Sequence, residues 1–167
     1  GIDGDSILTL GFEAVHDTRN QKENSNSGGK RRLAINFNEG LNNSKARYVK
    51  YEADVSQYFR LGSDRRVFVA RLYGQHNDDI NNGQIPFHQL AKLGGYGLHN
   101  RTSHTMRGFE YNRFFDETAL LLNLEYRYTI WEYREFKADT IFFLDEGQVF
   151  DEISDFEFSD FRESYGV

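Results

Sequence analysis

The chain has 167 residues, enough for one domain with its own core, and carries 26 acidic against 20 basic side chains. The formal net charge of −6, without any basic stripe, argues against a nucleic-acid partner, which would require many phosphates to be neutralised. Cysteine is absent, which excludes disulfides and cysteine-based metal sites, and no apolar run reaches the length of a transmembrane helix.

Aromatic residues make up 16% of the chain, although only 38% of it is hydrophobic and its mean hydropathy is −0.70. A polar chain rich in Phe and Tyr needs a structure that separates the two kinds of side chain. Strands do so, because successive residues point to opposite faces.

Alternation of apolar and polar residues predicts strands along most of the chain. In chain order the segments are ILTLGFEAVHD (7–17), RRLAINFNE (31–39), YVKYEADVSQYF (48–59), VFVARLYGQ (67–75) and TALLLNLEYRYTI (118–130). FKADTIFFLDEGQVF (136–150) is mixed, and FRESYGV (161–167) resembles the start of another strand. Apart from the stretch 76–117, the connections are short and rich in Gly, Asn, Asp and Ser, so we expect sequential antiparallel neighbours.

Strand length separates the architectures that alternate in this way. The segment 118–130 would reach about 43 Å at ~3.3 Å per residue, whereas globular strands usually have roughly 5 or 6 residues. Tilted by ~45°, it would still span the hydrocarbon layer of a bilayer. This length favours a transmembrane β-barrel, while a large soluble sandwich or a lipid-carrying barrel would show the same alternation.

Four motifs follow one another along the chain: IPFHQLAKLGG, MRGFEYNRF, ALLLNLEYRYTI and FFLDEGQVF. In this order they resemble the C-terminal β-barrel of the BamA/TamA/FhaC-like outer-membrane assembly and secretion superfamily, the bacterial surface antigen family. HDTRN, at the end of the first strand, is similar to the Asp-Thr-Arg that precedes a periplasmic turn in that family. The resemblance covers most of the chain.

In that family an Arg-Gly-Phe tripeptide at the tip of the long sixth extracellular loop folds back into the barrel lumen. The resemblance implies a loop lock made of Arg107, Gly108 and Phe109 at the tip, Glu125 on one wall strand, and Phe143, Asp145 and Gly147 on the next. The alternation agrees, since lipid-facing leucines at even positions of 118–130 put Glu125 inside. In the next strand, an inward Asp139 also puts Asp145 inside.

The fold class expected is therefore all-β: an antiparallel transmembrane β-barrel, with residues 1–167 forming one segment of about seven strands from a sixteen-stranded barrel. A long extracellular loop of about residues 76–117 would enter the lumen. The chain departs from the family pattern in two ways. Eleven residues, YGLHNRTSHTM, separate the Gly-Gly pair from Arg107, where the family usually has about four, and the chain would cover only about seven of the sixteen strands. We expect the remaining strands to lie outside this chain.

The resemblance implies a protein of the bacterial outer membrane that inserts or translocates other polypeptides, with no enzymatic activity and no cofactor. Its expected partners are outer-membrane lipids, unfolded outer-membrane or secreted polypeptide clients, and accessory assembly proteins. Two alternatives stay open: a membrane-anchoring barrel for a passenger such as a patatin-like phospholipase, and a soluble lipid-binding β-barrel.

Other residue types that could carry chemistry do not form a recognisable pattern. The spacing of the histidines assigned to the long loop matches no metal-ligand motif: His76, His88, His99 and His104. Asp145 and Glu146 are adjacent in a strand and point to opposite faces, so they cannot act as a catalytic acid pair. Ser103, beside a histidine, lacks the ordered acid that a hydrolase triad requires.

Overall fold

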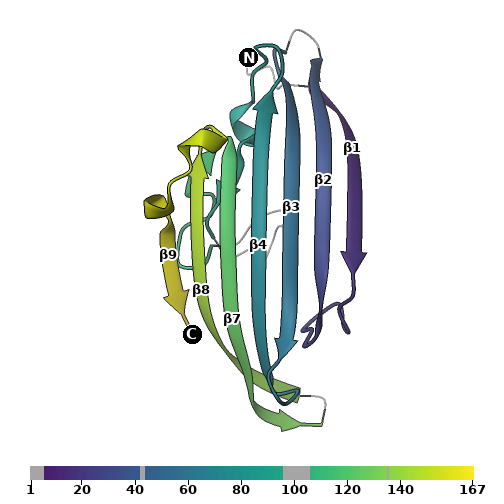
Figure 1. Ribbon diagram of the computed structural model, residues 1–167, viewed down its shortest axis with the longest axis vertical. Helices are drawn as coiled ribbons and strands as arrows, with labels where there is room; N and C mark the ends of the chain where they lie inside the picture. The colour runs from purple at the N-terminus through teal and green to yellow at the C-terminus, as the bar shows by residue number, and fades with distance from the viewer. Residues whose placement is uncertain (1–5, 42–43, 96–105, 135) are drawn as a thin grey trace.

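The computed structural model describes residues 6–41, 44–95, 106–134 and 136–167. Seven strands form one antiparallel sheet in the order β1-β2-β3-β4-β7-β8-β9 (Figure 1). Their bounds are β1 (Ser6–Asp17), β2 (Gly28–Leu41), β3 (Arg47–Arg60), β4 (Arg66–Asp79), β7 (Thr118–Tyr133), β8 (Phe136–Phe150) and β9 (Arg162–Gly166). The connection between β4 and β7 carries a separate two-stranded sheet, β5 (Ala91–Leu93) with β6 (Phe114–Asp116).

Regular helical structure in the described ranges consists of single 3-10 turns: η1 (Phe87–Gln89), η2 (Ile153–Asp155) and η3 (Phe158–Asp160). None of the helices described is long and apolar enough to cross a membrane. The all-β fold class and the antiparallel pairing predicted from the alternation are confirmed.

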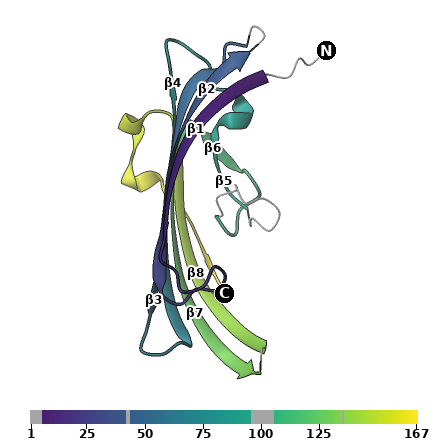
Figure 2. The same cartoon turned by 90° about the vertical axis from the view of Figure 1, so that its right-hand side faces the viewer.

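The large sheet is curved, and its two faces carry different connections. Figure 2 shows β5 and β6 on the concave side, with the η2–η3 segment on the opposite side. β1 and β9 lie at the two ends of the strand order, so the sheet is an open arc. An arc with one occupied concave face is what part of a barrel wall, with a loop folded into its interior, would look like.

Polar and charged side chains gather on the concave face, where they are linked by ion pairs across neighbouring strands. Arg32 bridges Glu13 of β1 and Glu52 of β3, and Arg71 of β4 binds Asp54 of β3. The convex face is apolar and exposed, with large side chains that include Leu8, Leu10, Phe12, Leu33, Ile35, Phe37 and Leu72. A bilayer against the convex face would remove these side chains from water.

The apolar part of the convex face runs obliquely across the strands. One row of paired residues reads, from β1 to β4, Leu10, Phe37, Val49 and Asp78. A second row lies nearer the short-turn end of the sheet, where β3 joins β4 and β7 joins β8. From β2 to β8 it reads Arg31, Val55, Leu72, Leu122 and Glu146. From β1 to β8 the apolar stretch therefore shifts toward the short-turn end and away from the long-loop end, which carries the 80–117 connection. Strands tilted against the membrane normal produce this slant, as barrel closure requires.

A β-bulge near the end of β7 changes which side chains face outward. The register between β7 and β8 shifts between Thr129 and Trp131, so that Thr129 pairs with Asp139 and Trp131 with Ala138. Because one residue is inserted, Trp131 joins the convex face although its number is odd. Trp131 stacks with Tyr133 at a centroid distance of 6.0 Å, which places two aromatic rings together at the short-turn end.

Several strands extend beyond their predicted bounds, and the extensions of β4 and β7 change the assignment of particular residues. β4 continues to Asp79, so assigning His76 to the long loop was wrong and the connection comprises residues 80–117. His76 extends the ladder because its Nδ1 lies 2.8 Å from Thr118 Oγ1 and its ring stacks on Tyr51. β7 likewise continues through Trp131 to Tyr133. His99, Ser103 and His104 lie outside the described residues.

Candidate functional site

The 80–117 connection is attached to the concave face by a small apolar core. Its buried members are Tyr73, Ala91, Leu93, Met106, Ala119 and Leu121, with Phe109, Phe114 and Val149 packed around them. These residues come from the wall strands β4, β7 and β8 and from the connection itself. The connection therefore contributes a packed surface as well as polar contacts, which a solvated loop does not do.

Gly147 creates the space into which this core fits. A Cβ at this position would lie 3.0 Å from both Leu93 Cδ1 and Met106 Sδ, and 3.4 Å from Leu121 Cδ1. The absence of a side chain on β8 lets the connection approach the wall closely. This is the physical reason for a glycine within an otherwise regular strand.

The chain reaches the site through tight turns at glycines. Gly94 and Gly95 have φ values of 114° and 89°, in the region that favours glycine, and Gly95 pairs with Met106 in an isolated antiparallel bridge. Gly108, with φ 83°, follows Arg107, and a Cβ there would lie 3.3 Å from Ser164 Cβ of β9. The tip backbone is thus held between the bridge at Met106 and the wall at Ser164.

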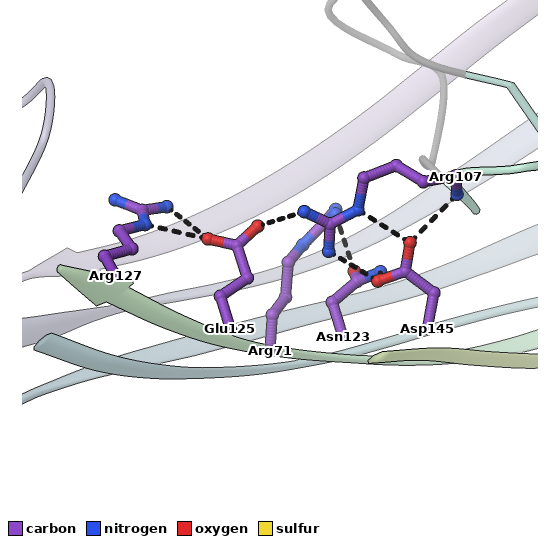
Figure 3. Close-up of polar contacts among 6 residues, drawn as sticks. All are labelled: Arg71, Arg107, Asn123, Glu125, Arg127 and Asp145. Carbon is purple, nitrogen blue, oxygen red and sulfur yellow. Dashed lines mark hydrogen bonds and ion pairs between the residues drawn. The ribbon is translucent and has the colours of Figure 1, made fainter. Parts of the chain in front are cut away.

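Arg107 is bound to the wall by four hydrogen bonds (Figure 3). Its backbone amide and its Nε donate to Asp145 Oδ2 at 2.9 and 2.8 Å, and its Nη2 donates to Asp145 Oδ1 at 2.5 Å. Its Nη1 donates to Glu125 Oε1 at 2.6 Å. Its guanidinium carbon also lies 4.0 Å from the centroid of the Phe143 ring, a cation–π distance.

The electrostatic environment keeps this arginine charged. Burial alone would lower the pKa of Arg107, but the hydrogen bonds and charges of Asp145 and Glu125 outweigh burial and raise it. The Asp145 side chain is fully buried, whereas Arg107 and Glu125 are 13% and 16% exposed. Asp145 therefore depends on its donors, because a carboxylate removed from water must be paired.

Most of the predicted lock residues meet at one site, but Phe109 does not. Arg107, Glu125, Phe143 and Asp145 are in direct contact, and Gly147 accommodates the core just described. Phe109 instead packs within the connection, edge-to-face on Phe114 at 5.1 Å between ring centroids. Its contribution is to the small core rather than to the charged cluster.

Three further residues extend the cluster and were not predicted. Asn123 donates to Asp145 Oδ1 at 2.8 Å and accepts a longer bond of 3.4 Å from Arg71. Arg127 donates to Glu125 Oε2 at 2.8 Å from the same strand. Asn123 and Arg127 share the inward parity of Glu125, so alternation could have indicated them. The bridge to β4 depends on register and could not be predicted.

Within the described ranges, no group of three or more His, Asp or Glu side chains could hold a metal ion. The cluster contains cations, carboxylates and one amide. It can hold a loop in place by charge-assisted hydrogen bonds, which are stronger than neutral ones.

Comparison with known proteins bears on the family and the fold of the chain. A model of the Omp85 superfamily domain matches residues 3–167. The fold is similar to that of BamA from Haemophilus ducreyi lacking POTRA domains 1–3, with a TM-score of 0.72 at 17% sequence identity, covering 86% of this chain. The chain spans about 30% of that BamA chain. No curated protein matched the sequence significantly.

Proposed function

The chain belongs to the Omp85 superfamily, and we propose that it forms part of a bacterial outer-membrane barrel that inserts or translocates other polypeptides. The family and the BamA-like fold support this role, as do the apolar convex face and the polar concave face. The single observation that carries the proposal is the binding of Arg107 to Glu125 and Asp145, which holds the 80–117 connection against the lumenal wall.

The proposed mechanism involves no covalent chemistry. The 80–117 connection acts as a plug on the lumenal face, and clients engage the barrel by pairing an extended strand with an exposed strand edge. The proposed partners are unfolded outer-membrane or secreted polypeptides, membrane lipids against the convex face, and accessory assembly proteins. The described strands form an open arc, so further strands would have to close the barrel.

The cluster is suited to fixing the plug in one position. Removing one partner of a buried ion pair typically costs ~3–5 kcal/mol, because the remaining charge is left buried and unpaired. Loss of Arg107 should release the connection rather than unfold the long strands, whose ladders do not depend on it. We infer that the plug and the wall behave as one unit only while Arg107 is bound.

The proposal is tested with the full-length protein carrying Arg107→Ala, assayed for insertion of a β-barrel client or for secretion. We expect a marked loss of activity while the heat-modifiable electrophoretic shift of the folded barrel persists. Arg113→Ala is the matched control, because Arg113 lies in the same connection and has no ion pair with Glu125 or Asp145 among those recorded for the described residues. Full activity of Arg107→Ala would contradict the proposal.

A further inference from the structure

A hollow of about 480 Å³ lies on the convex face between β2 and β8. Its floor is formed by Ala53 and Gly74, which are directly paired across β3 and β4. Larger side chains surround these two: Leu33, Ile35, Tyr51 and Leu120. The hollow exists because two small residues meet where their neighbours on the same face are large. Every strand that lines it has both of its neighbours in the sheet.

We propose that this hollow binds one acyl chain of a membrane lipid. The inference rests on the membrane placement in the proposed function, because the convex face must lie in a bilayer. The lining carbon atoms come mainly from Leu, Ile, Ala and aromatic side chains. A bound hydrocarbon chain would fill the hollow more closely than bulk lipid does. Closer packing increases the dispersion contacts between the chain and the protein.

The slant of the apolar surface gives the hollow a direction. At β2 it is lined by Leu33, which lies inside the apolar stretch, next to Ile35. At β8 it is lined by Phe150, which lies beyond Glu146 toward the long-loop end and therefore outside that stretch. The hollow therefore runs from inside the apolar stretch, at Leu33, to the rim of that stretch, at Phe150. An extended acyl chain would run the same way, from its terminus in the apolar region to its headgroup at the rim.

Among the lining residues whose side chains lie on the convex face, His76 and Thr118 are polar, and both lie at the end of the hollow nearest Phe150, where a headgroup would be. The Thr118 hydroxyl donates to the Asp151 carbonyl oxygen at 3.0 Å and lies 2.8 Å from His76 Nδ1. Ile153 of η2 closes the same end. A hydroxyl and an imidazole beside an apolar channel suit the ester region of a lipid, while the opposite end at Leu33 suits a chain terminus.

The test uses the full-length protein, stripped of lipid in detergent and then mixed with dimyristoyl phosphatidylethanolamine. Native mass spectrometry counts the phospholipid retained as collisional activation is raised. We expect one phospholipid to persist on the wild-type protein after the others are lost. Ala53→Leu fills the floor of the hollow. It should reduce the retained phospholipid species by about tenfold or more, because the acyl chain can then no longer bury its apolar surface there.

Ala70→Leu is the matched control, since Ala70 lies on the same face of β4 but does not line the hollow. It should retain the lipid as the wild type does. If Ala53→Leu fails to fold, Gly74→Val fills the hollow from β4, where Leu120 Cδ2 lies 3.2 Å from the added Cβ.

Unchanged phospholipid retention in the filled variant would overturn the inference. The inference would also fail if the species that Ala53→Leu abolishes were a protein dimer instead of a lipid adduct. Cysteine labelling at the positions of Phe12 and Glu13 tests membrane placement separately. A protein that passes the labelling test and fails the lipid test would leave the proposed function standing without this site.

Discussion

Asp145 binds the backbone amide of Arg107 as well as its guanidinium. One carboxylate of β8 therefore fixes both the main chain of the tip and its charged side chain. The orientation of the guanidinium is set further by Glu125, which accepts from the nitrogen that Asp145 does not use. A residue that carries only a positive charge would satisfy part of this arrangement.

Arg107→Lys distinguishes a pinned tip from simple charge attraction. Lysine keeps the charge and the backbone bond to Asp145, but it cannot bind two carboxylates through a planar fork. We expect protease cleavage between Gly94 and Phe115 in the folded full-length protein to be faster than in the wild type and slower than in Arg107→Ala. Cleavage of Arg107→Lys at the wild-type rate would mean that charge alone holds the tip.

Gly147→Ala tests whether the small apolar core contributes to docking. The added methyl group would meet Leu93 and Met106 at 3.0 Å, so the connection must move away from the wall at a cost of ~1–3 kcal/mol. We expect faster hydrogen exchange at β5, and partial recovery when Leu93→Ala is added to make room. Gly74→Ala, on the convex face, is the control. Equal hydrogen exchange at β5 in Gly147→Ala and in the wild type would show that the small apolar core has room for the added methyl group.

The large features of this fold could be predicted because they depend on alternation alone. Period two placed Glu125 and Asp145 on one face, and the pairing of β7 with β8 brings them within reach of one guanidinium. The link from Asn123 to Arg71 could not be predicted, because a polar inward residue in a barrel strand looks the same whether water or a neighbour solvates it. Register decides between the two.

The missed boundaries depend on pairing with other strands. β5 and β6 are only three residues long, too short for any period to show. The bulge before Trp131 inserts one residue without a glycine to mark it. His76 looked like part of a polar loop, although pairing with Thr118 and stacking on Tyr51 keep it in β4. In each case a contact distant in sequence decides the local structure.

Adjacent residues on β1 test the assignment of the two faces. Phe12 lies on the convex face with 66% of its surface exposed, while Glu13 on the concave face forms an ion pair with Arg32. In vesicles of the full-length protein, Phe12→Cys should resist a water-soluble maleimide and Glu13→Cys should react. Equal reactivity at both positions would remove the barrel interpretation, because it would show that water reaches both faces.

Glu117, at the base of the connection, gives a pH-dependent prediction. Its partial burial, followed by the charges of Asp151, Asp79, Asp116 and Asp78, raises its pKa above the usual 4.5. A carboxyl with a raised pKa in the folded state favours folding below its ordinary pKa, and this contribution is lost as pH rises through the folded value. At pH 7 the charged form therefore destabilises the base of the connection.

Glu117→Gln should consequently slow hydrogen exchange of the neighbouring amides at pH 7. The difference from wild type should vanish once the pH falls below the usual value of about 4.5, where the wild-type carboxyl is also neutral. A difference that persists unchanged at low pH would assign the effect to packing rather than to charge.

A double-mutant cycle on Arg107 and Asp145, measured as the rate of protease nicking between Gly94 and Phe115 in the folded full-length protein, tests the central claim most directly. If the two residues act through one contact, Arg107→Ala and Asp145→Ala should each release the connection, and the double variant should be little worse than either. The coupling should carry over to client insertion or secretion by the same variants. Strictly additive effects on both readouts would show that the residues act separately and that the contact does not hold the loop.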